Sequence, residues 1–214
     1  MANLSDIVEA LYPYVGDAPD ELLVSMYRRA ARTFFTDTRA WRDEVTATMG
    51  ADTATYSLAA PAGAEVFDFT QHEYGDTRLM KMTLEQTRSR DWPLTGNPYA
   101  IRIGAINEVI VMPDPGADIA SSLTLRAVLR PTLTATVLPD SEAARFAQAL
   151  EYGALQHVLR VPGQAWTDLK LSVYYGELFR EQIDIHTSTG ADGKGSVQLI
   201  NGADQIGTAT VTAT

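Results

Sequence analysis

The sequence lacks several of the residues on which protein chemistry most often depends. It contains no cysteine and only three histidines, His72, His157 and His186, among 214 residues. The absence of cysteine excludes disulfides, thiolate metal sites and cysteine nucleophiles. Three histidines leave little material for a metal site made of histidine alone.

Long apolar runs are also missing. No stretch approaches the ~20 residues that cross a bilayer, so no membrane association is expected. The start, MANLSDIVEAL, has no basic segment ahead of an apolar one, so a secretory signal is not expected either.

Positive charge is scarce relative to negative charge. Seventeen Lys and Arg stand against 27 Asp and Glu, which gives a formal net charge of −10. Proteins that hold nucleic acid by its phosphates usually show the opposite balance. The chain is therefore not expected to bind DNA tightly, although the charge allows it to lie near DNA. A hydrophobic content of 45% is ordinary for a globular protein.

The first fifth of the chain is predicted to be helical. Ser5 can cap a short helix that ends near residue 13, and GDAPDELL (16–23) begins a second helix with acidic residues in its first turn. The apolar stripe of this second helix is Leu22, Leu23, Met26, Tyr27, Ala30, Phe34 and Trp41. Four arginines, at 28, 29, 32 and 39, lie mostly opposite. We interpret them as a solvated or subunit-facing side rather than an isolated basic patch.

From about residue 51 the hydrophobic period changes to two, which predicts strands. Pro131 should end or bend the last of them. The alternating apolar residues are Tyr56, Leu58, Phe67, Phe69, Met80, Met82 and Leu84, and then Leu123, Leu125, Ala127 and Leu129, with Thr124, Arg126 and Arg130 opposite the last four. Short connections leave no room for crossover helices, so we expect an antiparallel β domain of about six strands.

Two antiparallel helices are predicted to follow, joined by a turn at Pro162-Gly163. Asp140 or Ser141 is expected to cap the first, and Thr167 the second. Gly153 and Gly176 lie at similar distances on either side of the turn. Because glycine costs a helix about 1 kcal/mol relative to alanine, the pair indicates either a close backbone crossing or two independently tolerated residues.

The last segment, residues 187–214, has a different composition. It is rich in Gly, Thr and Ala, and SVQLI and QIGTATVT flank a turn region that contains Asn201-Gly202, a hairpin signal. An isolated hairpin is marginal in water, so the segment should either be disordered or lie on a partner. Fully extended, it could reach on the order of 90–100 Å.

The sequence therefore predicts an α+β protein. The expected domains are the N-terminal half of a bundle of about four helices (1–48), an inserted antiparallel β domain (49–139), the C-terminal half of the bundle (140–186) and an extended C-terminal arm or hairpin (187–214).

No motif in the chain predicts catalysis, a cofactor or a metal. GADGKGS (190–196) lacks the spacing of a phosphate-binding loop, and QHEYGD (71–76) lacks the second histidine of a metalloprotease motif. Asp114 and Asp118 flank a Pro-Gly turn, where a solvated loop is a simpler interpretation than a metal site. We predict no catalytic residues, no cofactor-binding residues, no metal ligands and no enzymatic activity.

Two segments resemble a known family. The run LRPT (129–132) with LPDSEAARFAQALEYGALQHVLRVPGQAWTDLKLSVYYGELFREQI (138–183), and VSMYRRAARTFFTDTRAWRDEV (24–45), are similar to the head-to-tail adaptor proteins, or connectors, of tailed bacteriophages, the tail tubular protein A-like family. The likeness covers residues 5–45 and 129–183 well, and covers the β insert only in order and character.

The resemblance implies a structural virion protein of the neck, assembled in the host cytoplasm. It implies a homo-oligomeric ring, usually twelvefold, between the portal protein and a tail or nozzle protein. The helical bundles would face the portal and the β domain the tail. The genome would pass through the lumen without specific binding, and no catalytic residue is carried over.

Two alternatives stay open. One is another neck or tail-completion protein of the virion. The other is a ligand- or carbohydrate-binding β module on a helical base, for which Trp92, Tyr99 and Tyr74 would supply aromatic stacking, although such residues more often belong to a core or an interface.

Overall fold

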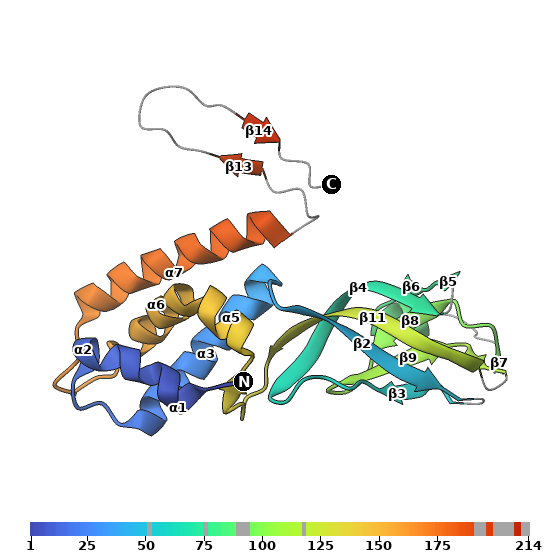
Figure 1. Ribbon diagram of the computed structural model, residues 1–214, viewed down its shortest axis with the longest axis horizontal. Helices are drawn as coiled ribbons and strands as arrows, with labels where there is room; N and C mark the ends of the chain where they lie inside the picture. Colours follow the sequence, from blue (N-terminus) through green and yellow to red (C-terminus); the bar gives the residue numbers. More distant parts are fainter. Residues whose placement is uncertain are drawn as a thin grey trace. The chain divides into compact units, whose positions relative to one another are not determined.

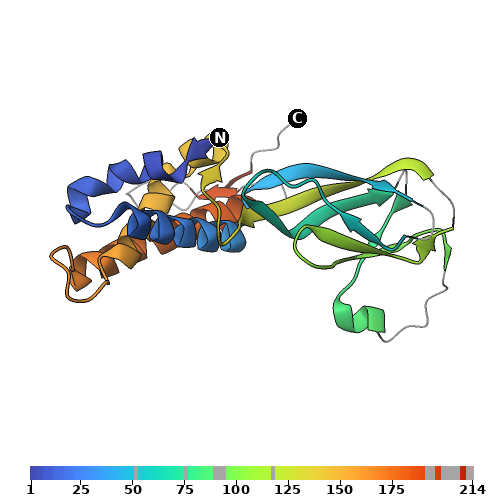
Figure 2. The same cartoon turned by 90° about the horizontal axis from the view of Figure 1, so that it is seen from below.

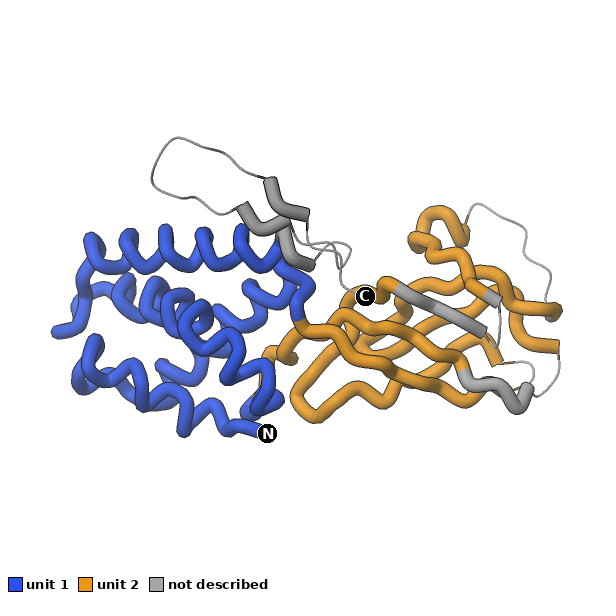
Figure 3. The backbone as a smooth tube through the Cα atoms, turned by 45° about the horizontal axis from the view of Figure 1, so that its top comes forward, with its two compact units in different colours: residues 1–40, 136–214 blue, residues 41–135 orange. Residues whose placement is uncertain are grey.

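The chain divides into two compact units. The computed structural model describes residues 1–50, 53–74, 77–88, 95–116, 119–190, 196–198 and 208–210. Residues 1–40 and 136–214 form one unit, here named the helical unit, and residues 41–135 form the other, here named the β unit (Figure 3). The predicted α+β class with antiparallel sheets is confirmed.

The helical unit takes its helices from both ends of the chain (Figure 1). A two-residue antiparallel pair, β1 (Ala2–Asn3) with β12 (Val137–Leu138), also joins the two ends. The helices are α1 (Leu4–Ile7), the 3-10 helix η1 (Val8–Leu11), α2 (Tyr12–Val15), α3 (Asp20–Thr38), α5 (Asp140–Arg145), α6 (Ala147–Val158) and α7 (Leu169–Gly190). The last helix continues beyond residue 186, where the sequence predicted the arm to begin.

The limits of the helices follow from a few local residues. Helix α3 begins directly after Pro19, carries Asp20 and Glu21 in its first turn, and ends at Arg39, whose φ of 53° is left-handed. Acidic residues in the first turn favour the helix because they complement the positive end of its dipole.

The predicted helix caps were wrong in three places. Ser5 lies inside α1, which follows Asn3, and α5 follows Pro139 without a side-chain cap. The cap of α7 is Asp168, which accepts a hydrogen bond from the Leu171 amide at 2.9 Å. Thr167 instead bonds within the preceding turn, to Gln164 and Val161. Aspartate, serine and threonine all cap helices well, so the sequence could not rank neighbouring candidates.

Aromatic rings fill the core between α3, α5–α6 and α7. The Phe34 ring lies 5.0 Å from Phe146 and 6.3 Å from Phe179, centroid to centroid. His186 packs edge-on to both Phe34 and Phe146. Phe34, Phe146 and Phe179 are each at most 4% exposed. Burying such rings is the main contribution to the stability of this unit.

Helices α6 and α7 run antiparallel at close range. A Cβ built on Gly153 would lie 2.8 Å from both the Ala30 Cβ and the Phe179 ring, and one built on Gly176 would meet the Gln156 side chain at 3.1 Å. Gly153 therefore marks a close approach of three helices. Gly176 faces only a flexible side chain, so the two glycines do not form the single crossing that their spacing suggested.

Among the described residues, the β unit has two four-stranded sheets. Figures 1 and 2 show how their strands run. The first has the order β2 (Arg42–Met49), β11 (Ile119–Pro131), β4 (Ala64–Tyr74), β5 (Thr77–Arg78). The second has the order β3 (Thr55–Ser57), β9 (Glu108–Met112), β8 (Ala100–Ile103), β6 (Met80–Lys81). Strands β7 (Thr95–Gly96) and β10 (Asp114–Pro115) form a further short pair.

Strand β11 is the centre of the first sheet and follows the predicted pattern. Its inward residues Leu123, Leu125, Ala127 and Leu129 have no exposed surface, and Arg126 on the other face is exposed. The strand ends at Pro131, as predicted. Two register irregularities lie on β4, where Thr70 and Phe67 are the residues without a partner in the register to β11, and Val128 is buried as well.

Several details of the β unit differ from the sequence-based expectation. Strand β2 begins at Arg42, inside the segment assigned to helix up to residue 48, and Trp41 belongs to the β unit rather than to the stripe of α3. Leu84 begins a short helix, α4 (Leu84–Arg88), and Met80 is exposed. The pairs β6–β8 and β7–β10 are parallel. Segments of two to five residues are too short for their periodicity to distinguish strand from helix.

Two ion pairs hold carboxylates that the β unit almost buries. Arg130 Nε donates to Glu65 Oε1 at 2.7 Å, and Lys81 donates to Asp68. Each carboxylate side chain is 8% exposed. Such groups need a partner, because burying an unpaired charge is costly.

In the C-terminal segment, β13 (Ser196–Gln198) pairs antiparallel with β14 (Thr208–Thr210). This matches the predicted pairing of SVQLI with QIGTATVT. The predicted turn at Asn201-Gly202 lies outside the described residues.

Candidate functional site

The residues considered for chemistry do not converge. No group of three or more His, Asp or Glu within the described ranges could hold a metal ion. His72 lies on β4 and Asp114 on β10, whereas Asp118 lies outside the described residues, as does most of GADGKGS. For the carbohydrate alternative, Tyr99 is 42% exposed, Tyr74 ends β4, and Trp92 lies outside the described residues.

Two histidines lie in the helical unit and are perturbed by packing. Burial lowers the pKa of His157 on α6, with smaller contributions from the charges of Arg29 and Arg160. Burial also lowers the pKa of His186 on α7, with a further contribution from Arg145. A lowered pKa favours the neutral form of each imidazole. We interpret both side chains as packing groups.

A buried tyrosine and a half-buried glutamate face each other between α3 and α6. Burial raises the pKa of Tyr27, and the charge of Glu151 adds to the effect. Burial also raises the pKa of Glu151. We interpret the pair as structural.

Four tyrosines gather on the outside of the helical unit. Tyr175 of α7 lies 6.0 Å from Tyr14, 5.7 Å from Tyr152 and 5.5 Å from Tyr174, centroid to centroid. Tyr14 and Tyr174 are more than half exposed, and Leu169 and Val173 on α7 are also exposed. Exposed aromatic clusters of this kind are typical of protein-binding surfaces.

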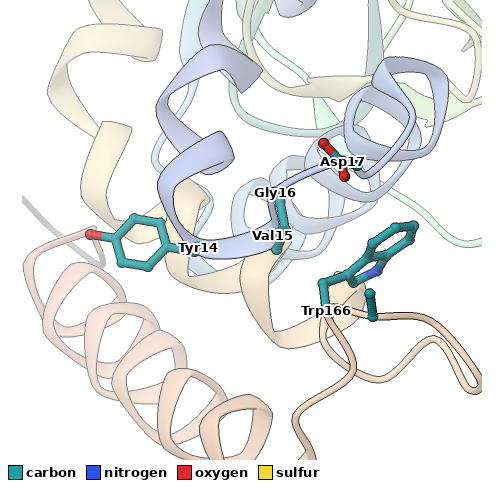
Figure 4. Close-up of a pocket in the computed structure, with 6 residues that line it drawn as sticks. Tyr14, Val15, Gly16, Asp17 and Trp166 are labelled. Atoms are coloured by element: carbon teal, nitrogen blue, oxygen red, sulfur yellow. The ribbon is translucent and has the colours of Figure 1, made fainter.

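An open pocket of about 270 Å³ lies beside this tyrosine cluster (Figure 4). Tyr14, Val15, Gly16 and Asp17 line one side, and Ala165 and Trp166 the other. Two loops thus form it, the turn after α2 and the turn between α6 and α7. The Trp166 indole Nε1 is buried and has no hydrogen-bond acceptor among the described residues.

The arrangement offers binding surfaces rather than reacting groups, and comparison with known proteins agrees. The sequence model of one protein family, described as SU10 adaptor protein, matches residues 2–198. The chain belongs to the SU10 adaptor protein family. The predicted membership of a phage head-to-tail adaptor family is confirmed. No curated protein matches the chain.

Membership of the SU10 adaptor family makes this chain a structural protein of bacteriophage particles, located at the virion neck. An adaptor interacts with other virion proteins, so its surfaces are its functional sites. No described helix of the SU10 adaptor chain is both long and apolar enough to cross a membrane.

Sequence reasoning missed the exposed surface of this adaptor. The signal was present as two close tyrosine pairs, YPY (12–14) and VYY (173–175). In the second pair Tyr175 is buried, whereas Tyr174 is 54% exposed.

Proposed function

We propose that this protein forms a ring between the portal and the tail of a bacteriophage, through which the genome passes. The observation that carries the proposal is the family match over nearly the whole chain. Such rings are built from identical copies that contact one another head to tail, so each copy needs two different, complementary surfaces. By analogy with the family, the ring has twelve copies and no catalytic role.

The two units support a division of labour within such a ring. The helical unit, a bundle assembled from both ends of the chain, would face the portal, and the β unit would face the tail or nozzle protein. The exposed tyrosine cluster supports the first assignment, because aromatic side chains are enriched where proteins bind one another.

The charge of the chain supports passage of DNA without retention. Twelve copies at −10 each would carry on the order of a hundred negative charges. A lumen lined by carboxylates would repel phosphates, so the genome could slide past. Mapping the charged residues in an assembled ring tests this point, and a basic lumen would rule it out.

The C-terminal segment 187–214 would serve as an attachment arm. Strands added to an exposed sheet edge bind mainly through backbone hydrogen bonds and need few specific side chains, which suits a segment rich in Gly, Thr and Ala. Deleting 187–214 should leave a folded subunit that fails to join the ring or the portal. Normal assembly of the truncated protein into virions would disprove this role.

The experiment that tests the whole proposal is imaging of the purified protein mixed with its portal. We expect a ring of copies bound to one end of the portal. The isolated protein should be measured beside it, because a monomer in the absence of the portal is compatible with templated assembly. Absence of any complex with the portal would contradict the proposal.

A further inference from the structure

The function proposed above gives no role to the pocket that Tyr14, Asp17 and Trp166 help to line. Figure 4 shows the Trp166 indole on the same side of the hollow as Asp17, whereas the Tyr14 ring points away from both. Asp17 makes no hydrogen bond or ion pair with the residues that the structure describes. The pocket therefore contains a carboxylate and an indole N–H that both lack a partner within the described chain.

Among the described residues, Asp17 is the one charged side chain in the lining of the pocket. Residues 1–27 contain five carboxylates and no Lys or Arg, and the loop from Val161 to Leu169 adds only Asp168. Two of these carboxylates are already engaged, because Tyr12 donates to Asp20 at 2.7 Å and Asp168 caps α7. Asp17 is the carboxylate that lines the pocket and has no partner among the described residues, so it can meet a cation from outside.

We infer that the pocket binds an arginine side chain presented by a different protein of the virion. A planar guanidinium can stack on the Trp166 ring and pair with Asp17 at the same time. The apolar flank formed by Leu169, Val173 and Tyr174 would hold the rest of the segment that carries the arginine.

The net charge of −10 complements a cationic segment of a different protein, which favours an arginine from such a partner. Several cations of the chain are also engaged internally, since Arg130 pairs with Glu65, Lys81 with Asp68 and Arg160 with Ser172. That the partner belongs to the virion rests on the proposed function, whereas the preference for a guanidinium does not.

The first test titrates the full-length protein with N-acetylarginine amide and follows the indole N–H signals by NMR. Three tryptophans give three signals, and Trp166→Phe identifies the one that matters. We expect saturable binding with a dissociation constant on the order of millimolar, since the probe is small. Asp17→Asn should weaken it about three- to fivefold.

The control variant is Ile106→Ala, which removes a 70% exposed side chain of the β unit. It should bind the probe like the unmodified protein. An equal response to N-acetylnorleucine amide, no response at all, or no effect of Asp17→Asn would each overturn the guanidinium assignment. None of these outcomes depends on whether a ring forms.

The second test places the photo-crosslinker p-benzoylphenylalanine at Tyr14 in assembled particles, with the same group at Ile106 as control. We expect adducts from position 14 in an arginine-containing segment of another virion protein. Adducts with a second copy of this chain, or none beyond the control, would overturn the partner assignment. Failure of the protein to join its portal would instead contradict the proposed function.

Discussion

In the helical unit, Phe34, Phe146 and Phe179 come from helices far apart in sequence and share one apolar core, whereas in the β unit two nearly buried carboxylates each need a cation. The first unit depends on shape complementarity, and the second depends partly on charge. Apolar packing responds little to salt, while ion pairs near the surface weaken as salt screens them. The two units should therefore differ in how they respond to mutation, salt and pH.

The largest effect is expected for Phe34→Ala. Removing this ring leaves a cavity among Phe35, Phe146 and His186, which should destabilise the helical unit by about 3–5 kcal/mol. Hydrogen exchange measured by mass spectrometry should show lost protection in α6 and α7. Leu169→Ala, at a 64% exposed position, should change stability by less than about 0.5 kcal/mol. Equal loss of protection in β9 and β11 would show that the units do not respond separately.

The next effect concerns the Glu65–Arg130 pair of the β unit. Arg130→Leu leaves a nearly buried carboxylate without its cation, and we expect a loss of about 1–3 kcal/mol that is larger at low salt. Combining it with Glu65→Leu should recover part of the loss. Arg126→Leu on the exposed face of the same strand is the control. Urea unfolding at two salt concentrations gives the free energy of unfolding of the unmodified protein and of the three variants. Identical salt dependence of the Arg130→Leu and Arg126→Leu variants would contradict the account.

A smaller contrast separates the two helix glycines. At Gly153 an added methyl meets the Ala30 Cβ at 2.8 Å, so Gly153→Ala should cost about 1–2 kcal/mol, after the gain of up to ~1 kcal/mol in helix propensity. Gly176→Ala meets only the movable Gln156 side chain and should be neutral or stabilising. Thermal unfolding compares them. Equal changes in melting temperature would show that the close approach at Gly153 does not make its added methyl group more costly than the one at Gly176.

The smallest effect is the pH response of His186. Burial lowers its pKa in the folded protein, so the unfolded chain binds the proton more readily. The resulting stability is present above the ordinary histidine pKa near 6.5 and is lost as the pH falls through the lower, folded value. Because the side chain is largely solvent-screened, we expect under about 0.5 kcal/mol. His186→Phe should show a smaller drop in melting temperature from pH 7.5 to pH 5, and an unchanged drop would contradict this origin.

Much of the fold could be predicted because its long segments carry a clear period. The helical period of α3 predicts that Leu23 and Tyr27 are buried, and the alternation along β11 predicts the same for Leu123 and Leu125. All four are buried. Strand β2 was missed because RDEVTATM follows directly on a strongly helical segment and begins with three charged residues. The left-handed Arg39 that ends α3 carries no recognisable cap signal.

The candidate binding surface could not be predicted, since it depends on tertiary proximity. Tyr14 and Trp166 are more than 150 positions apart and meet only because α2 and the α6–α7 turn lie side by side. Periodicity assigns a residue to a face of its own helix, but not to a neighbour on another element.

The most direct test of the account is a map of the virion neck that resolves the two units of each copy. We predict a ring in which the helical units contact the portal, with Tyr14 and Trp166 covered, and the β units contact the tail. A neck in which this protein forms no ring, or in which the β units contact the portal and the tyrosine cluster is open to solvent, would contradict it.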